Sequence, residues 1–311
     1  MASLPGTLTT LIGDITGHGT TPAAPVGNSP YSTIYAFGDS LSDTGNDYHV
    51  SLDKVPVSPP YDGGRFSNGP LWIEDLATGM GLPAPTPSLK GGNDFAYGGA
   101  YTGTIQGHTA NPADLPYQLT QFQAEVPHPD ANALCTVWIG ANDLISGLGP
   151  GHDDIALVNA AVSNEMTFLN GLAADGAKTI LVANVPDLGK TPDAIAAGPL
   201  YQAQGSLVSA LFDMKLQDSL TAFDAARPGV QVAELDTYSL LDAAIANPAA
   251  FGLTNVTSPL WTGNFTNPSS GRLATTDPHV QAGYLFFDGL HPTATGHQFL
   301  AAAAAQVLGV A

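Results

Sequence analysis

Positively charged residues are scarce in this chain. Its 311 residues include 8 Lys and Arg against 27 Asp and Glu, which gives a net charge of −19 at pH 7. A surface of that sign repels nucleic-acid phosphates and anionic membranes. We therefore expect no nucleic-acid partner, and we attribute the acidity to solubility.

Cysteine is almost absent as well. Cys135 is the only one, so the chain forms neither an internal disulfide nor a thiolate metal cluster. It stands in the apolar run 133–139, where a buried structural thiol is expected. Aspartates 39, 43 and 47 recur every four residues but lack the ligand pattern of an EF-hand loop, and we expect no metal and no cofactor.

Long hydrophobic runs and basic leader residues are missing too. The alanine-rich stretch 299–311 is too short to cross a bilayer, so no transmembrane segment is expected. Residues 1–53 contain neither Lys nor Arg, and no signal peptide is visible. Residues 1–30, rich in Gly, Thr and Pro, are expected to form a flexible arm before a single domain, residues 31–311.

From residue 32 onward, strand patterns alternate with helix patterns, and no internal repeat is visible. Strands are expected at 33–37, 134–139, 178–183 and 230–235, with a further short extended segment at 93–100. Helices are expected near 71–76, 117–125, 153–174, 199–227 and 238–246, and from 292 onward. This alternation is typical of βαβ units, and it predicts one doubly wound α/β domain with a parallel sheet.

The most informative stretch is Phe37–Asn46, which reads Phe-Gly-Asp-Ser-Leu-Ser-Asp-Thr-Gly-Asn. It begins where the first expected strand ends, so Ser40 stands at the carboxyl end of that strand. Ligands bind at this edge of open parallel sheets, where the next helix also directs its N-terminal amides. Taken alone, the pattern fits a nucleophilic serine and a plain helix-capping turn equally well; the residues concerned are Asp39, Ser40, Ser42 and Asp43.

A serine nucleophile needs a base, and the base needs an orienting acid. Of the eight histidines, His291 follows Asp288 by three residues, a spacing that puts both side chains on the same side of a turn. His279, two residues after Asp277, has poorer geometry and is the reserve candidate. The other histidines are expected to be ordinary surface or core residues.

Ester cleavage also requires donors to the oxyanion. The backbone N–H of Ser40 is one candidate, and Gly98 or Gly99 offers another at a strand-to-loop transition. The side-chain amide of Asn142, after the strand at 134–139, is a third. Each also has a plain interpretation, since glycine pairs form turns and asparagine caps helices.

These blocks, in this order, resemble the GDSL family of lipases and esterases, the SGNH hydrolases. The resemblance implies a nucleophile at Ser40, an acid at Asp288 and a base at His291. It places the oxyanion hole at Ser40, Gly99 and Asn142, with Gly98 as the one-residue alternative. It also implies a flavodoxin-like three-layer α/β/α sandwich with a five-stranded parallel sheet.

Two further stretches, Gly64–Trp72 and Asn184–Gly189, resemble a longer subgroup of that family. This subgroup includes plant-type, fungal acetylesterase-like and bacterial outer-membrane esterase passenger sequences. Residues 255–281 match none of its blocks. The subgroup implies a secreted or cell-surface protein, and a cytoplasmic location stays open.

The reaction expected from the resemblance is hydrolysis of carboxylic esters with short-to-medium acyl chains, on a small-molecule or lipid substrate. A carbohydrate acetylesterase is the alternative enzyme, and a catalytically silent binding or surface-passenger module is the alternative from another class. Asp39 and Asn46 are expected to fix the serine loop. Four aromatic residues are candidates for an acyl pocket or a sugar platform: Trp72, Tyr97, Tyr101 and Trp138. For Trp138 at least, core packing is the expected role.

Overall fold

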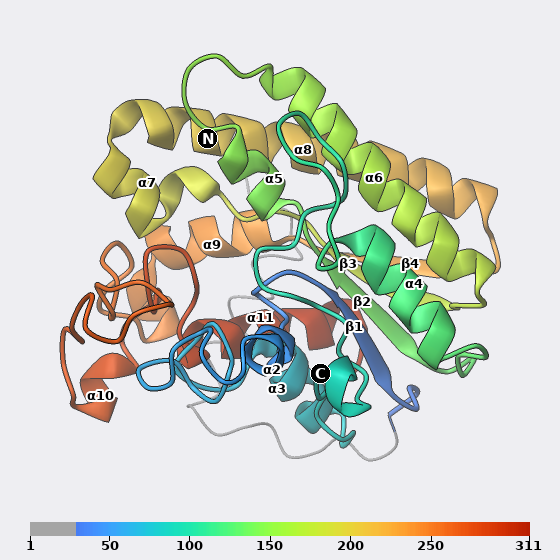
Figure 1. Cartoon of the computed structure of the whole chain (residues 1–311), viewed down its shortest axis with the longest axis horizontal. Coiled ribbons are helices and arrows are strands. Elements are labelled where there is room, and N and C mark those ends of the chain that lie inside the picture. The colour runs from blue at the N-terminus through green and yellow to red at the C-terminus, as the bar shows by residue number, and fades with distance from the viewer. Residues whose placement is uncertain (1–28) are drawn as a thin grey trace.

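The computed structural model describes residues 29–311, so the expected arm at 1–30 lies almost entirely outside the described residues. A parallel sheet forms the centre of the molecule (Figure 1), in the order β1-β2-β3-β4. Its strands are β1 (Ile34–Gly38), β2 (Leu134–Trp138), β3 (Thr179–Ala183) and β4 (Gln231–Leu235). The strands end level, because Gly38 is paired with Trp138 and Trp138 with Ala183. The loops that follow them therefore meet at one edge.

The expectation of five strands was wrong in its count, since the described residues form four. The fifth place is taken by residues 93–97, which run beside the free edge of β1 and meet it at a single bridge between Ala36 and Asp94. Two backbone hydrogen bonds, of 3.0 and 2.7 Å, join the segment to Ala36. The Gly38 N–H, which a longer ladder would direct at the Phe95 carbonyl, donates instead to the side chain of Gln118. The order of the five segments is nevertheless that of a flavodoxin-like sheet.

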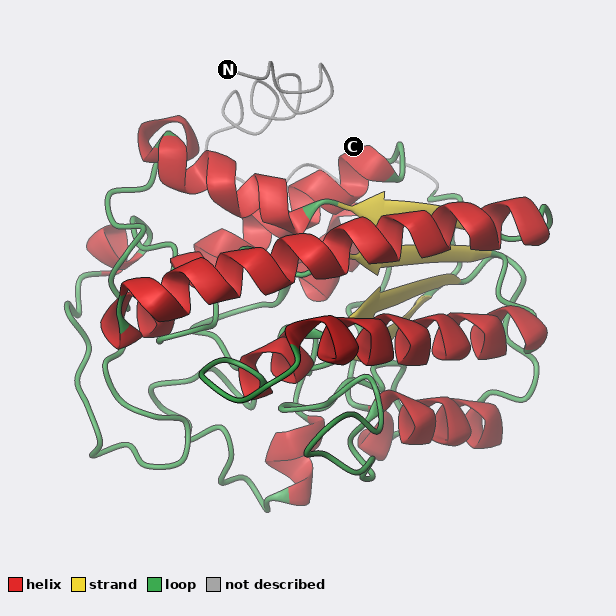
Figure 2. Ribbon diagram, turned by 90° about the horizontal axis from the view of Figure 1, so that it is seen from above, coloured by secondary structure: helices red, strands yellow, loops and turns green. Residues whose placement is uncertain are grey.

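Helices cover both faces of the sheet, which confirms the three-layer architecture (Figures 1 and 2). One face carries α4 (Leu115–Glu125), α6 (Asp154–Ala174) and α8 (Pro199–Ala226); the other carries α3 (Trp72–Gly79), α9 (Thr237–Ala246) and α11 (Ala294–Val307). Successive strand side chains point to opposite faces. Phe37 and Val137 join the first core, and Ala36 and Trp138 join the second.

Short helices in the connecting loops were not expected from the sequence, because they are too brief to show a period. They are α2 (Asn46–Val50), α5 (Ala141–Ser146), α7 (Pro192–Ala197) and α10 (Pro278–Gln281), with the 3₁₀ turns η1 (Ser88–Lys90), η2 (Leu188–Lys190) and η3 (Pro248–Phe251). Within residues 29–311, no helix combines the length and apolar character needed to cross a membrane. The same part of the chain holds no cluster of His, Cys, Asp and Glu arranged to bind a metal.

Candidate active site

Ser40 lies in a tight turn directly after β1, and Gly38 makes that turn possible. Gly38 has a φ of +142°, and a Cβ at this position would stand 2.1 Å from the carbonyl oxygen of Trp138. Gln118, from α4, fixes the turn further: its side chain accepts from the Gly38 N–H at 2.9 Å and donates to the Gly38 carbonyl at 2.7 Å. The serine is therefore presented on a rigid strand end.

The structure brings Ser40, His291 and Asp288 together. Nε2 of His291 lies 2.8 Å from Oγ of Ser40, and Nδ1 lies 2.8 and 3.0 Å from the two oxygens of Asp288. All three side chains are buried. This is the order of contacts that a nucleophile, a base and an orienting acid require. The reserve candidate, His279, is instead exposed on α10, where its backbone N–H donates to Asp277.

Asp288 is held from three further directions. The backbone N–H groups of Leu290 and His291 donate to Oδ1 at 2.9 and 2.7 Å. The hydroxyl of Tyr61 donates to Oδ2 at 2.6 Å. Tyr61 comes from a proline-rich loop, and its ring packs edge-on against Phe287 with centroids 4.8 Å apart. The acid therefore has a fixed orientation toward the imidazole.

Asp288 and His291 each stabilise the charged form of the other. Burial alone would raise the pKa of Asp288, but His291 and the hydrogen bonds, including that of Tyr61, hold it below its usual value. Burial alone would lower the pKa of His291, but Asp288 outweighs this and raises it, with smaller contributions from Asp39 and Asp193. Burial raises the pKa of Asp39 to about 7, against the opposing effects of the Leu41 N–H and His291. The site thus keeps an ionised acid beside a histidine whose pKa lies above its usual value.

The choice between Gly98 and Gly99 as oxyanion donor follows from their hydrogen bonds. The Gly98 N–H donates to Oδ2 of Asp43 at 3.0 Å and is therefore engaged. Within the described residues, the N–H groups of Ser40 and Gly99 have no protein acceptor. Gly99 has a φ of +70° and open space on the side where a Cβ would project. The free amide is that of Gly99, which fits the first of the two expectations.

Asn142 stands in the first turn of α5, after β2. Its side-chain amide donates to the carbonyl of Ala100 at 2.9 Å, which ties it to the loop that carries Gly99. The amide group has a second hydrogen available for a ligand. Asn142 therefore lines the same pocket as Ser40 and is tied to the loop that carries Gly99.

The loop around the serine is braced by buried acids. Asp43 accepts from the N–H groups of Gly45, Asn46 and Asp47 as well as Gly98, and it is fully buried. The Asn46 amide links this turn to residues 94–96, as expected of a residue that fixes the loop. The Asp43 carboxylate therefore binds backbone amides of its own loop and of the loop that carries Gly98.

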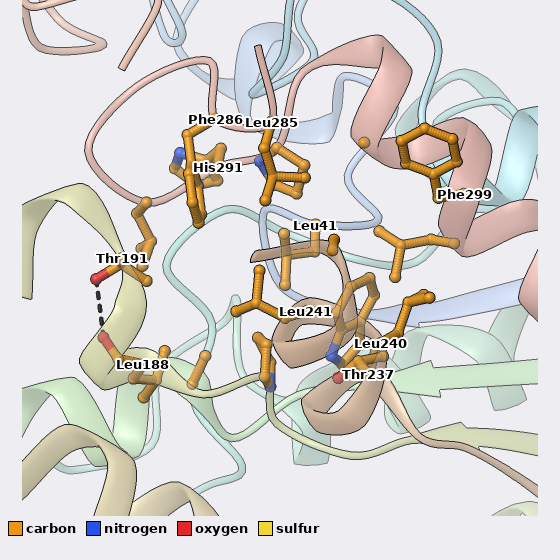
Figure 3. Close-up of a pocket in the computed structure, with 18 of the residues that line it drawn as sticks. Leu41, Leu188, Thr191, Thr237, Leu240, Leu241, Leu285, Phe286, His291 and Phe299 are labelled. Atoms are coloured by element: carbon orange, nitrogen blue, oxygen red, sulfur yellow. Dashed lines mark hydrogen bonds between the residues drawn. The ribbon is translucent and has the colours of Figure 1, made fainter. Parts of the chain in front are cut away.

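An apolar pocket extends from the serine toward α9 and α11 (Figure 3). The pocket is partly open to solvent. His291 and Phe286 lie at one side of it and Phe299 at the other, with leucines between them. Its apolar walls include Leu41, Trp138, Leu188, Leu240, Leu241, Phe251, Leu285, Phe286, Phe299 and Leu300.

Most of the four aromatic residues predicted as pocket candidates lie outside the apolar pocket. Trp138 lines the pocket, whereas Trp72 is fully buried beneath it and packs edge-on against Trp138 at 5.7 Å. The Tyr97 hydroxyl donates to Gln121, and Tyr101 stacks on His108 at 3.8 Å. Of the four rings, only Trp138 lines the pocket, although it also packs in the core as expected. The pocket opens toward α9 and α11, away from the other three.

Comparison with known proteins places this site in context. The family model described as GDSL-like lipase/acylhydrolase matches residues 34–304. The chain belongs to that GDSL family. It is a carboxylic ester hydrolase with the fold of SGNH hydrolases, which confirms the resemblance drawn from its sequence blocks.

Individual GDSL relatives differ in length. A phosphatidylcholine-sterol acyltransferase of Aeromonas hydrophila is 34% identical over 260 residues, covering 81% of this chain and 72% of that protein. Esterase EstA of Pseudomonas aeruginosa is 30% identical over 322 residues, covering 90% of this chain but 46% of that protein. Among solved structures, a carbohydrate acetylesterase of Sinorhizobium meliloti is 16% identical with a TM-score of 0.45, covering 90% of this chain and 99% of that one.

Proposed function

We propose that this GDSL enzyme hydrolyses carboxylic esters through an acyl-serine intermediate at Ser40. The observation that carries the proposal is the 2.8 Å contact between Nε2 of His291 and Oγ of Ser40, with Asp288 behind the imidazole. Nε2 takes the serine proton as Oγ attacks the ester carbonyl, and then gives it to the departing alcohol. Water repeats the sequence on the acyl-serine, and the proton returns to Oγ.

The negative charge of each tetrahedral intermediate needs fixed donors. The free N–H groups of Ser40 and Gly99 and the second amide hydrogen of Asn142 take this role in the proposal. Asp288 stays ionised throughout and stabilises the imidazolium, consistent with the lowering of its pKa. A catalytically silent binding module is disfavoured, because the serine, histidine and acid are already in hydrogen-bonding distance of one another.

The apolar pocket supports an acyl chain of short-to-medium length. Its walls are leucine and phenylalanine side chains, which favour an alkyl chain over a polar acyl group. A carbohydrate acetylesterase would use the same chemistry, but the apolar leucine and phenylalanine walls would contact only its small acetyl group. The acyl side of the site therefore favours the lipid-like or small-molecule ester.

The relative from A. hydrophila favours a second reaction, transfer of the acyl group to an alcohol. The same acyl-serine serves both reactions, and only the nucleophile in the second half differs. Product analysis with an ester donor and added alcohol distinguishes them. A new ester whose yield rises with alcohol concentration would support transfer, and free acid alone would support hydrolysis.

Covalent trapping tests the proposed nucleophile directly. Incubation with diethyl p-nitrophenyl phosphate should release one p-nitrophenolate per chain and abolish activity. Mass spectrometry should then locate the diethylphosphoryl group on Ser40. Labelling at another serine, or full activity after labelling of Ser40, would contradict the proposal. Ser206→Ala is a matched control outside the site, since its hydroxyl bonds Asp187 beside α8.

A further inference from the structure

A second group of aromatic rings covers His291 away from the acyl pocket. The Phe66 ring lies against the imidazole, with centroids 5.3 Å apart and planes tilted by 32°. Phe265 packs edge-on against Phe66, with centroids 5.6 Å apart. The residues that line the apolar pocket do not include either phenylalanine. The two rings therefore border a different part of the site.

Phe66 is a fixed wall between the base and the oxyanion loop. Its ring atoms lie 2.5 Å from the point where a Cβ on Gly98 would stand, so the ring packs against Gly98. The side chain is 3% exposed, and it also contacts Tyr61 at 6.4 Å between centroids. The ring therefore borders the site between His291 and Gly98.

Phe265 extends that wall toward solvent. It belongs to residues 255–281, which match no block of the family, and its ring is 41% exposed. The Phe265 carbonyl accepts from the Val57 N–H at 2.8 Å, so the loop before α10 lies beside the loop after α2 (Figure 1). Trp261 and Leu260 anchor the same segment, because both are buried with Tyr61 and Phe287. The exposed ring is thus held in place at the rim of the site.

We propose that Phe265 and Phe66 form a subsite for the alcohol portion of the ester, and that it prefers alcohols that carry a six-membered ring. The inference rests on the proposed function, in which Nε2 of His291 protonates the departing alcohol. The alcohol therefore lies alongside the imidazole, where the two rings are, while the acyl chain enters the apolar pocket. Aromatic faces bind a hydrocarbon ring or the C–H face of a sugar ring by the same apolar contact.

The test compares kcat/KM for three acetates that differ only in their alcohol: ethyl, benzyl and a methyl glucoside acetylated on its primary hydroxyl. The wild type should favour a ring-bearing alcohol over ethanol. Phe265→Ala should lower the ratio of kcat/KM for the ring-bearing esters to that for the ethyl ester by about 5- to 10-fold, since the ring of the substrate alcohol loses one apolar contact. Phe265→Tyr should restore the ratio because it keeps the ring. Tyr117→Ala, on α4, removes another exposed ring and should leave the ratio unchanged.

The outcomes of this test distinguish the alcohol subsite from the proposed ester hydrolysis at Ser40. A larger loss for benzyl acetate assigns the subsite to hydrocarbon rings, and a larger loss for the glucoside ester assigns it to sugars. An unchanged ratio in Phe265→Ala, with ester hydrolysis that still depends on Ser40, would overturn the subsite alone. Activity that survives Ser40→Ala would overturn the proposed function itself.

Discussion

The hydroxyl of Tyr61 donates a 2.6 Å hydrogen bond to Oδ2 of Asp288, although the two residues are 227 positions apart. The bond joins the proline-rich loop after α2 to the turn that carries the base. Burial and the neighbouring acid both raise the pKa of Tyr61, so the hydroxyl stays a donor at every working pH. We assign Tyr61 the role of orienting Asp288.

Tyr61→Phe tests this role with little change of shape. We expect kcat to fall about 10-fold with KM nearly unchanged, because a hydrogen bond to a charged group contributes about 1.5–3 kcal/mol. Steady-state kinetics on an aliphatic ester and a thermal melt measure both effects. Tyr97→Phe is the control, since it removes a hydroxyl that bonds Gln121. A loss of stability with unchanged kcat would show that Tyr61 acts in packing only.

Asn142→Ala removes the proposed side-chain donor to the oxyanion. We expect kcat to fall about 10²–10³-fold, as for other oxyanion donors, with a small change in KM. Asn132→Ala, on the exposed loop before β2, is a matched control. A rise in KM at constant kcat would mean that Asn142 binds the ground state and has no special role in the transition state.

The pH dependence of kcat/KM reports the protonation of His291. Only the neutral imidazole accepts the serine proton, so activity should rise with pH through an apparent pKa above 6.5. The carboxyl groups that raise this pKa are Asp288, Asp39 and Asp193. Asp39→Asn removes a carboxyl group that ionises near pH 7 and whose negative charge raises the pKa of His291, so the acid limb should move to lower pH.

A pH-stat series on wild type and Asp39→Asn measures the shift. Asp218→Asn, on the exposed side of α8, is the control and should leave the limb in place. A limb that moves to higher pH in Asp39→Asn would contradict the assigned charge interaction.

Glu165 links stability to pH. Its side chain, on α6, is fully buried, and neither carboxyl oxygen has a hydrogen-bond partner. Burial raises its pKa well above 4.5, so the folded protein keeps a proton that the unfolded chain releases. The free energy of unfolding should therefore fall as pH rises from about 4.5 through the folded pKa. Burial of Asp143 and Asp213, whose pKa values rise to about 7 and 8, acts in the same direction.

Glu165→Gln removes this titration while it keeps the side-chain shape. Relative to the wild type, its Tm should increase as the pH is raised from 5 to 8. Glu125→Gln, at an exposed position on α4, is the control. A constant difference in Tm across this range would contradict a buried, protonated Glu165.

The sequence predicted those parts of the site that sit at strand ends. Parallel strands bring their carboxyl ends to one edge, so the blocks at Ser40 and Asn142 had to meet there. The contact of Asp288 with His291 followed from their three-residue spacing. The engaged Gly98 amide depends on the carboxylate of Asp43, which distinguishes two adjacent glycines only in three dimensions.

Other features of the site and fold could not be predicted from the sequence. Tyr61 lies in a loop without periodicity, and its partner is far away in the sequence. The acyl pocket is built from α9 and α11, whose leucines and phenylalanines look like ordinary core residues in the sequence. The segment 93–97 does not extend into a full fifth strand because the Gln118 side chain takes the Gly38 N–H that a longer ladder would use.

The central claim is a nucleophilic Ser40 that serves an apolar acyl pocket. The measurement that tests it most directly is hydrolysis of p-nitrophenyl esters, acetyl through palmitoyl, by the wild type and Ser40→Ala side by side. We expect activity that peaks at short or medium chains and falls at least about 10⁴-fold in the variant. Comparable activity in Ser40→Ala, or no hydrolysis at any chain length by folded wild type, would contradict the account.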